Sequence, residues 1–204
     1  MESIEKIAGF VLAGGESSRM GRPKALLEIA GVPMLTRAAR LIESVADLCA
    51  VIGQRHELEY VHLRAIGDEF PGCGPLGGIA TVLGVSAAAW NLVIACDLPY
   101  LTKPWLNYLV KRAVASRSDA VIPMNERGAE PLCAMYHKRG EVAIRCALGS
   151  GIRKVTDGLT ALAIERIEPS EWKAFDSDGL LFKNMNSPED YEEARRRLDD
   201  RASS

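Results

Sequence analysis

Short apolar runs alternate along this chain with stretches in which apolar residues recur at helical spacing. Residues 7–12 form the first run, and an amphipathic stretch over 33–46 leads to a second run over 48–52, a pattern that predicts a β-α-β unit. Further strands are expected at 64–66, 92–95, 120–123 and 132–136, with helices at 76–89 and 103–116. The alternation predicts an α/β fold in which helices cover both faces of a sheet, with parallel pairing among its early strands.

The C-terminal segment carries the signals of a helix start. Ser187 can cap the helix, a proline fits its first turn, and the acidic residues that follow favour its positive end. Tyr191, Ala194 and Leu198 recur at helical spacing and form its expected buried stripe. After them, residues 199–204 are expected to form a flexible tail.

Chain length and composition predict one folded unit. The sequence has 204 residues, of which 48% are hydrophobic, and it contains no linker, repeat or low-complexity block, so we expect a single domain over 1–198. The formal charge is −2. Without a long basic run, nucleic acid is not expected as a partner.

No segment is predicted to enter a membrane or to direct export. The longest apolar stretches fall well short of the roughly 20 residues that a membrane helix needs, and residues 1–6 lack the basic start and apolar core of a signal peptide. The five cysteines form no C-x-x-C pair, which argues against a disulfide framework and a zinc site. Cys96 and Cys133 are expected to be small buried apolar residues. We therefore expect a cytoplasmic protein with reduced thiols.

A loop rich in glycine, serine and positive charge follows the first strand directly. Residues 12–24 read L-A-G-G-E-S-S-R-M-G-R-P-K, and Arg19, Arg22 and Lys24 supply three positive charges. Small residues let backbone N–H groups approach phosphate, and charge-assisted bonds to phosphate oxygens are strong. The dinucleotide pattern G-x-G-x-x-G is absent, and the Walker pattern fails because alanine follows Lys24. The loop predicts a triphosphate site; the alternative is a tight turn with solvated charges.

Asp97 follows the buried run over 92–96 and is expected at the carboxyl edge of the sheet, where open α/β sheets bind their ligands. A carboxylate at that edge can hold Mg²⁺, which prefers oxygen ligands and shares them with substrate phosphates. Leu98 and Pro99 would end the strand. The alternative role for Asp97 is to cap the helix that begins near Pro104. Because that helix begins too far along the chain from Asp97, capping is the less favoured role.

The glycine loop resembles the signature of the molybdenum cofactor guanylyltransferases, within the wider superfamily of nucleotidyltransferases. The shared pattern is L-A-G-G-x-S-x-R-M-G-x-x-K, and similar segments follow in the same order at 74–79, 95–99, 130–132 and 184–190. The resemblance implies a three-layer α/β/α sandwich with a mostly parallel mixed sheet, GTP, Mg²⁺, and a molybdopterin acceptor whose terminal phosphate attacks the α-phosphorus. A molybdoenzyme or chaperone partner would then receive the product.

Positions that match the family pattern are expected to bind nucleotide, with Arg19 near the phosphates. The expected nucleotide contacts are Leu12, Ala13, Gly14, Gly15, Lys24, Asp68 and Asp97. For Asp68, a turn-forming role is the alternative. Gly77 lies in a second glycine loop, where a helix N-terminus can approach the ligand closely. Relatives often carry Asn after the second strand, where this chain has Gln54.

Two polar turns are expected near the acceptor. The resemblance places Asn184 and Asn186 beside the metal and the acceptor, whereas Asn at such a position often forms an Asx turn or cap instead. Arg153 and Lys154 follow a glycine-containing turn and could receive the acceptor's phosphate. Ordinary surface charge is the alternative for these two residues.

The expected chemistry is an in-line displacement in which the cationic loop and Mg²⁺ stabilise the pyrophosphate leaving group, so Arg19, Lys24 and Asp97 are the expected catalytic residues. A phosphate monoester is anionic near neutral pH, and no general base is required. Relatives that use CTP tend to read L-A-A-G, so Gly14 favours the guanylyl reaction. The alternatives are cytidylyl transfer to the same cofactor, nucleotidyl transfer to a sugar phosphate, and nucleotide binding or cofactor delivery without chemistry.

Overall fold

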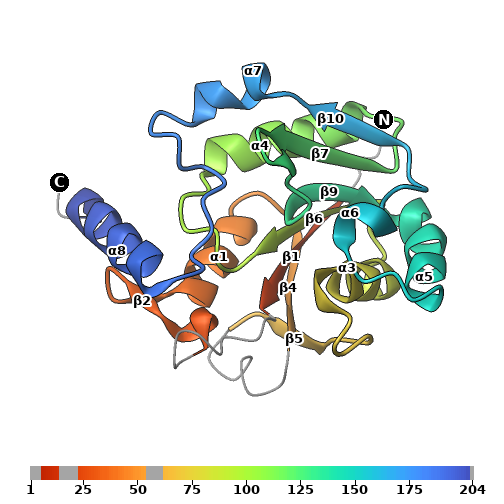
Figure 1. Cartoon of the computed structure of the whole chain (residues 1–204), viewed down its shortest axis with the longest axis horizontal. Coiled ribbons are helices and arrows are strands. Elements are labelled where there is room, and N and C mark those ends of the chain that lie inside the picture. Colours follow the sequence, from red (N-terminus) through yellow and green to blue (C-terminus); the bar gives the residue numbers. More distant parts are fainter. Residues whose placement is uncertain (1–5, 14–22, 54–61, 203–204) are drawn as a thin grey trace.

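A central sheet with helices packed on both faces forms the body of the protein in the computed structural model (Figure 1). The structure describes residues 6–13, 23–53 and 62–202, with side chains through residue 200. The sheet order is β10-β7-β9-β6-β1-β4-β5, and β8 pairs with β7. The strands are β1 Ile7–Ala13, β4 Leu48–Gly53, β5 Arg64–Gly67, β6 Trp90–Ala95, β7 Ala120–Asn125, β8 Gly128–Ala129, β9 Cys133–His137 and β10 Ile164–Ile167.

The sheet is mixed and mostly parallel, as expected. β1 lies between β4 and β6 and is parallel to both, while β9 lies between β6 and β7 and is antiparallel to both. β4 is parallel to β5, and β7 is parallel to β10. The carboxyl ends of β1, β4, β5, β6 and β7 therefore meet at one edge, and β9 begins at that same edge.

Helices form the two outer layers, which confirms the three-layer sandwich. The helices are α1 Met34–Glu43, α3 Gly74–Val85, α4 Lys103–Ala115, α5 Glu141–Gly149, α6 Val155–Gly158, α7 Pro169–Trp172 and α8 Pro188–Ala202. Short 3₁₀ turns occur at Lys24–Leu26, Lys138–Gly140 and Lys173–Phe175. α1 and α4 pack on one face of the sheet, and α3 and α5 pack on the other.

The first strand contributes to both layers of the core. Ile7 and Val11 pack with α1 and α4, whereas Phe10 and Leu12 pack with α3. Because successive strand side chains point to opposite faces, a strand buried on both sides must be apolar throughout. All seven residues of β1 are buried. This double burial fixes the position from which the glycine loop leaves the sheet.

A small hairpin and the C-terminal helix form a third cluster beside the sheet. β2, Glu28–Ile29, pairs antiparallel with β3, Val32–Pro33, through a turn in which Ala30 and Gly31 have positive φ. Ile29 of the hairpin is buried in a cluster with Ala194 of α8. The helix therefore docks on the hairpin rather than on the sheet (Figure 1).

The predicted start and buried stripe of α8 are confirmed. The Asp190 amide donates to the Ser187 hydroxyl at 3.2 Å, and Tyr191, Ala194 and Leu198 belong to the hairpin cluster. The flexible tail expected over 199–204 is wrong for residues 199–202, because α8 continues to Ala202. The Ala30 amide donates to the Asp199 carboxylate at 2.7 Å, and this bond holds the last turns of the helix against the hairpin.

The long predicted elements all occur, with ends that differ by a few residues. The helix expected over 76–89 begins at Gly74, since Pro75 fits a first helical turn, and it ends at Val85. The pattern did not predict several elements, which either are short or come after the antiparallel strand β9 in the chain. They are β2, β3, β8, α5, α6, β10 and α7. Across the part of the chain that the structure describes, every helix is too short or too polar to cross a membrane.

We predict that Gly77→Ala destabilises the fold. A Cβ at this position would lie 2.8 Å from the Phe70 carbonyl oxygen and 3.0 Å from the Cys73 Cβ, so backbone must move to admit it. Such overpacking costs about 1–3 kcal/mol. The measurement is the denaturation midpoint in urea, which should fall relative to the unmodified protein.

Gly149→Ala is the matched control for this substitution. A Cβ at Gly149 would meet no atom within 4 Å, so its midpoint should stay equal or rise through the better helix propensity of Ala. Equal midpoints for the two variants would contradict the close approach of α3 at Gly77.

Candidate functional site

Polar groups collect at the carboxyl edge of the sheet. In the order of the strands, this edge carries Asp68 after β5, the glycine loop after β1, Asp97 after β6, Glu130 just before β9, and Asn125 at the end of β7. Ligands of open α/β sheets bind in the crevice at this edge. The fold therefore places the predicted site residues Asp68 and Asp97 on either side of the end of β1.

Lys24 joins two residues that are distant in the sequence. Its Nζ lies 3.4 Å from an Asp97 carboxylate oxygen and donates to the Asn186 Oδ1 at 2.8 Å. The side chains of Lys24 and Asp97 are 22% and 19% exposed, so the ion pair is partly shielded from water. The expected convergence of Lys24 and Asp97 is thus present in the structure.

Backbone contacts bring the three segments together. The Cys96 amide donates to the Leu12 carbonyl at 3.1 Å, which ties the end of β6 to the end of β1. The Met185 amide donates to the Asp97 carbonyl at 3.0 Å, which holds the turn before α8 against Asp97. Met185 itself is 1% exposed, so its burial anchors this turn.

The alternative role of Asp97 as a helix cap does not occur. Thr102 caps α4, and its hydroxyl accepts from the Trp105 amide at 3.5 Å. The Asp97 carboxylate faces Lys24 instead. Asp97 therefore pairs with Lys24 and does not cap α4.

Asn184 and Asn186 flank Met185, whose amide binds the Asp97 carbonyl, and their side-chain oxygens have different surroundings. The Asn186 oxygen accepts from Lys24, while Ser187 and Asp190 form the cap of α8. The Asn184 Oδ1 is buried, and no described group donates to it. A buried acceptor without a donor is costly. Among the described residues, the Asn184 oxygen is thus a buried acceptor without a donor, and its binding role stays a prediction.

Asp68 performs the turn-forming role that was its alternative interpretation. One carboxylate oxygen accepts from the Phe70 amide at 2.9 Å and from the Thr81 hydroxyl at 2.8 Å. These bonds link the end of β5 to α3. Binding of nucleotide by Asp68 stays a prediction.

Gly78 lets α3 approach the sheet closely, whereas Gly77 faces the turn that precedes the helix. A Cβ at Gly78 would lie 3.1 Å from the Leu12 Cδ1, so the helix packs directly on the end of β1. The first turn of α3 therefore lies beside the point where the glycine loop begins. A helix N-terminus in this position favours an anion.

Arg153 and Lys154 make local contacts. The Arg153 guanidinium donates to the Leu148 and Ile152 carbonyls at 3.0 and 2.9 Å, and the Lys154 Nζ lies 3.5 Å from an Asp157 oxygen. These contacts fit the surface alternative, and acceptor binding by the two residues stays a prediction. Leu12 and Ala13 are buried at the end of β1, while Gly14, Gly15, Arg19 and Gln54 lie outside the described residues.

Glu130 and Asn125 form a further polar pair at this edge, to which the sequence analysis assigned no role. The Asn125 side-chain amide donates to the Glu130 carboxylate. Burial raises the pKa of the Glu130 carboxyl to about 7, although the bond from Asn125 and the charge of Arg127 act in the opposite direction. The signal in the sequence was the segment over 130–132, which matches the family pattern and begins with the carboxylate of Glu130.

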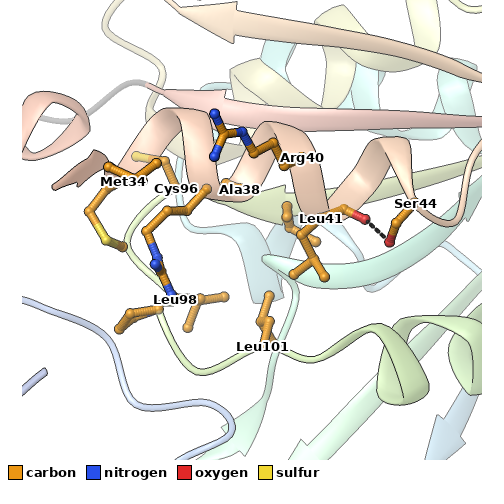
Figure 2. A pocket seen from close by; sticks show the side chains of 12 residues that line it. Met34, Ala38, Arg40, Leu41, Ser44, Cys96, Leu98 and Leu101 are labelled. Atoms are coloured by element: carbon orange, nitrogen blue, oxygen red, sulfur yellow. Dashed lines mark hydrogen bonds between the residues drawn. The ribbon is translucent and has the colours of Figure 1, made fainter. Parts of the chain in front are cut away.

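A cavity of about 340 Å³ lies between α1 and the segment that follows β6 (Figure 2). Met34, Ala38 and Leu41 of α1 face Leu98 and Leu101 across it. Its lining does not include Lys24, Asp97 or Asn186. The cavity is therefore separate from the polar cluster, although Cys96 and Leu98, which flank Asp97, form part of its wall.

Comparison with known families identifies the chain. The family model for the MobA-like NTP transferase domain matches residues 9–164, well over half of the sequence. The chain belongs to this family. Its members share the nucleotidyltransferase core, so the edge that carries Lys24 and Asp97 is the part of this family member where nucleotide chemistry is expected.

Relatives extend the similarity over nearly the full length. The chain is 32% identical over 188 residues to a probable molybdenum cofactor guanylyltransferase of Pelotomaculum thermopropionicum, covering 92% of this chain and 91% of that protein. It is 34% identical over 202 residues to a protein of the same description from Natronomonas pharaonis, covering 93% and 97%. The turn with Asn184 and Asn186 lies beyond the family model but within the span of such full-length similarity.

A solved structure supports the fold. The crystal structure of molybdopterin-guanine dinucleotide biosynthesis protein A from Archaeoglobus fulgidus superposes with a TM-score of 0.84 at 23% identity, over 95% of this chain and 99% of that one. At this identity the likeness shows the fold of the family. The sheet order and helix layers described above are therefore those of a known nucleotidyltransferase architecture.

We predict that Glu130→Gln stabilises the protein at pH 8. The folded-state pKa of about 7 lies above the ordinary value of 4.5, so the folded protein holds a proton more tightly than the unfolded chain. The charged carboxylate therefore lowers the free energy of unfolding. This loss is complete above pH 7 and disappears as the pH falls to 4.5. The urea midpoint of the Gln variant should exceed that of the unmodified protein at pH 8 and match it at pH 4.5. A lower midpoint at pH 8 would contradict the burial of the charge.

Proposed function

We propose that this protein transfers GMP from GTP to the terminal phosphate of a molybdopterin-type cofactor and releases pyrophosphate. The observation that carries the proposal is the convergence of Lys24 and Asp97, which come from separate segments, at the carboxyl edge of the sheet. The similar proteins described as probable molybdenum cofactor guanylyltransferases support the choice of substrates.

The nucleotide would lie along the loop after β1. Backbone groups of Leu12, Ala13, Gly14 and Gly15 would line the triphosphate, and the close packing of Gly78 on Leu12 brings the start of α3 to the same place. Arg19 would add charge from the loop itself. Asp68 would contact the nucleoside from the end of β5.

Lys24 would stabilise the charge that develops on the leaving pyrophosphate. Its ammonium group is already oriented by Asp97 and Asn186, so little reorganisation is needed when phosphate arrives. In the reaction, an acceptor phosphate oxygen forms a bond to the α-phosphorus, and the bond between the α-phosphorus and the bridging oxygen to the β-phosphate breaks. The electron pair leaves with pyrophosphate, and no proton must be removed from an acceptor phosphate that is already anionic.

The cluster also fits Mg²⁺. The Asp97 carboxylate, the Asn186 oxygen and the buried Asn184 oxygen without a described donor are the hard oxygen ligands that this cation prefers. When bound, Mg²⁺ supplies positive charge to the triphosphate and favours departure of pyrophosphate. Asp97 and the two asparagines would hold it.

Arg153 and Lys154 would receive the acceptor's phosphate in this proposal. Gly158, which follows them, packs on Leu76 in the first turn of α3, and this contact keeps their turn on the face that α3 covers. We further propose that the reaction takes place in the cytoplasm. A molybdoenzyme or chaperone partner would receive the product.

The test of the reaction is an assay of pyrophosphate release with Mg²⁺, molybdopterin and each nucleoside triphosphate in turn. We expect release with GTP. Release with CTP alone would replace the guanylyl assignment by a cytidylyl one, and tight nucleotide binding without release on any acceptor would favour a binding or delivery protein.

We predict that Asp97→Asn lowers turnover by about 10²-fold or more without unfolding the protein, the scale of losing one preorganised electrostatic group. The isosteric amide can keep the contact with Lys24 but removes the negative charge that would hold the cation. Turnover with GTP and molybdopterin is the measurement, with circular dichroism to verify the fold.

Asp200→Asn serves as the matched control, because Asp200 is an exposed carboxylate near the end of α8. Its turnover should equal that of the unmodified protein. Near-normal turnover of Asp97→Asn would remove the metal role from Asp97.

A further inference from the structure

Glu130 lies just before β9, at the sheet edge where Asp97 follows the neighbouring strand β6. The last register pair of β6 and β9 is Ile94 with Cys133, and Asp97 and Glu130 lie in the segments that adjoin this end of the two strands. The Ala95 amide still donates to the Leu132 carbonyl at 2.9 Å, so the two segments leave the sheet side by side. Since β6 and β9 are adjacent in the sheet, Glu130 and Asp97 lie at the same edge beside neighbouring strands.

The two sides of Asp97 along this edge are not equivalent. β1, with the glycine loop, is the neighbour of β6 on one side, and β9, which follows Glu130, is its neighbour on the other. Asn125 ends β7, the next strand beyond β9. A nucleotide bound along the glycine loop therefore leaves the Glu130 side for the second substrate.

The Glu130 segment is held rigidly. The Glu130 amide donates to the Pro123 carbonyl at 2.8 Å, and the Glu130 carbonyl accepts from the Cys133 amide at 3.2 Å. The Tyr136 hydroxyl donates to the Pro131 carbonyl at 2.7 Å. A site on such a fixed backbone can orient a ligand accurately.

Folding alone does not explain a carboxylate at this position. Among the described groups, the Glu130 side chain accepts a hydrogen bond from Asn125, a neutral amide, and a glutamine could accept the same bond. The titratable or charged groups near it are Arg127 and the Cys133 thiol, and neither forms an ion pair with it in the described structure. A half-buried ionisable group without a counter-charge is typical of a functional site.

We propose that Glu130, oriented by Asn125, binds the hydrogen-bond donor edge of the acceptor's heterocycle. This inference rests on the proposed function, because a pterin presents an amino group beside a ring N–H. A carboxylate accepts two such parallel N–H bonds, as it does from arginine. Guanine has a similar edge, but the nucleotide lies on the β1 side of Asp97, so Glu130 selects the acceptor and not the base of GTP.

The test measures the KM of each substrate for Glu130→Gln in the pyrophosphate release assay. The amide keeps an acceptor for Asn125 but loses the charge and one acceptor oxygen. We expect the KM for molybdopterin to rise about tenfold or more, the scale of losing a charge-assisted hydrogen bond, and the KM for GTP to change by less than about twofold.

Glu126→Gln is the matched control, since Glu126 is an exposed carboxylate in the turn between β7 and β8. Its two KM values should equal those of the unmodified protein. A rise in the KM for GTP with Glu130→Gln, or no change in the KM for molybdopterin, would overturn the assignment.

The pH dependence of the KM provides a readout that a purely structural role would not change. Protonation removes the charge and replaces an acceptor by a donor, so the KM for molybdopterin should rise as the pH falls below the Glu130 pKa of about 7. The Glu130→Gln variant should lack this rise. An identical pH profile in both proteins would overturn the assignment.

A binding measurement with molybdopterin alone, monitored through the fluorescence of molybdopterin, distinguishes failure of the proposed function from failure of the Glu130 site. If the unmodified protein releases no pyrophosphate with GTP, the proposed function fails, but weaker molybdopterin binding by Glu130→Gln than by Glu126→Gln still supports the site. Equal affinity of the two variants would overturn the inference even when the enzyme is active.

Discussion

The contact of the Lys24 ammonium with the Asp97 carboxylate and the Asn186 oxygen brings three distant segments to one point. Lys24 follows the glycine loop, Asp97 follows β6, and Asn186 precedes α8. A charged cluster of this kind is only partly shielded, so it contributes little to folding by itself. Its effect is to hold the segment after the glycine loop and the turn before α8 against the carboxylate that follows β6.

The packing of β1 makes this arrangement possible. A strand that is buried on both faces cannot slide, because a shift by one residue would exchange its two faces. Gly78 allows α3 to approach the end of this strand, and the bond from Cys96 to Leu12 fixes β6 beside it. The core therefore determines where the end of β1, the carboxylate after β6 and the N-terminus of α3 meet. The chemistry of this place then depends on which side chains stand at these three ends.

Glu130 differs from the Lys24–Asp97 pair, because its negative charge lowers folding stability. Burial without a counter-charge raises its pKa, which means that the ionised form is held at the expense of folding stability. Lys24 and Asp97, in contrast, compensate each other's charge. The edge thus combines a carboxylate that is paired with Lys24, beside β6, and a carboxylate without an ion pair among the described groups, beside β9.

The sequence by itself determined the long strands and helices, the position of the loop after β1 and of Asp97 after β6, because local apolar periodicity reports which faces are buried. It also determined the start of α8, where cap and stripe are local signals. Only the tertiary structure decided that β9 runs antiparallel between β6 and β7, that Asp199 binds the hairpin, and that Asn125 donates to Glu130 at the edge that carries Asp97. Strand direction and such contacts depend on packing between segments far apart in the chain, and no local pattern contains that information.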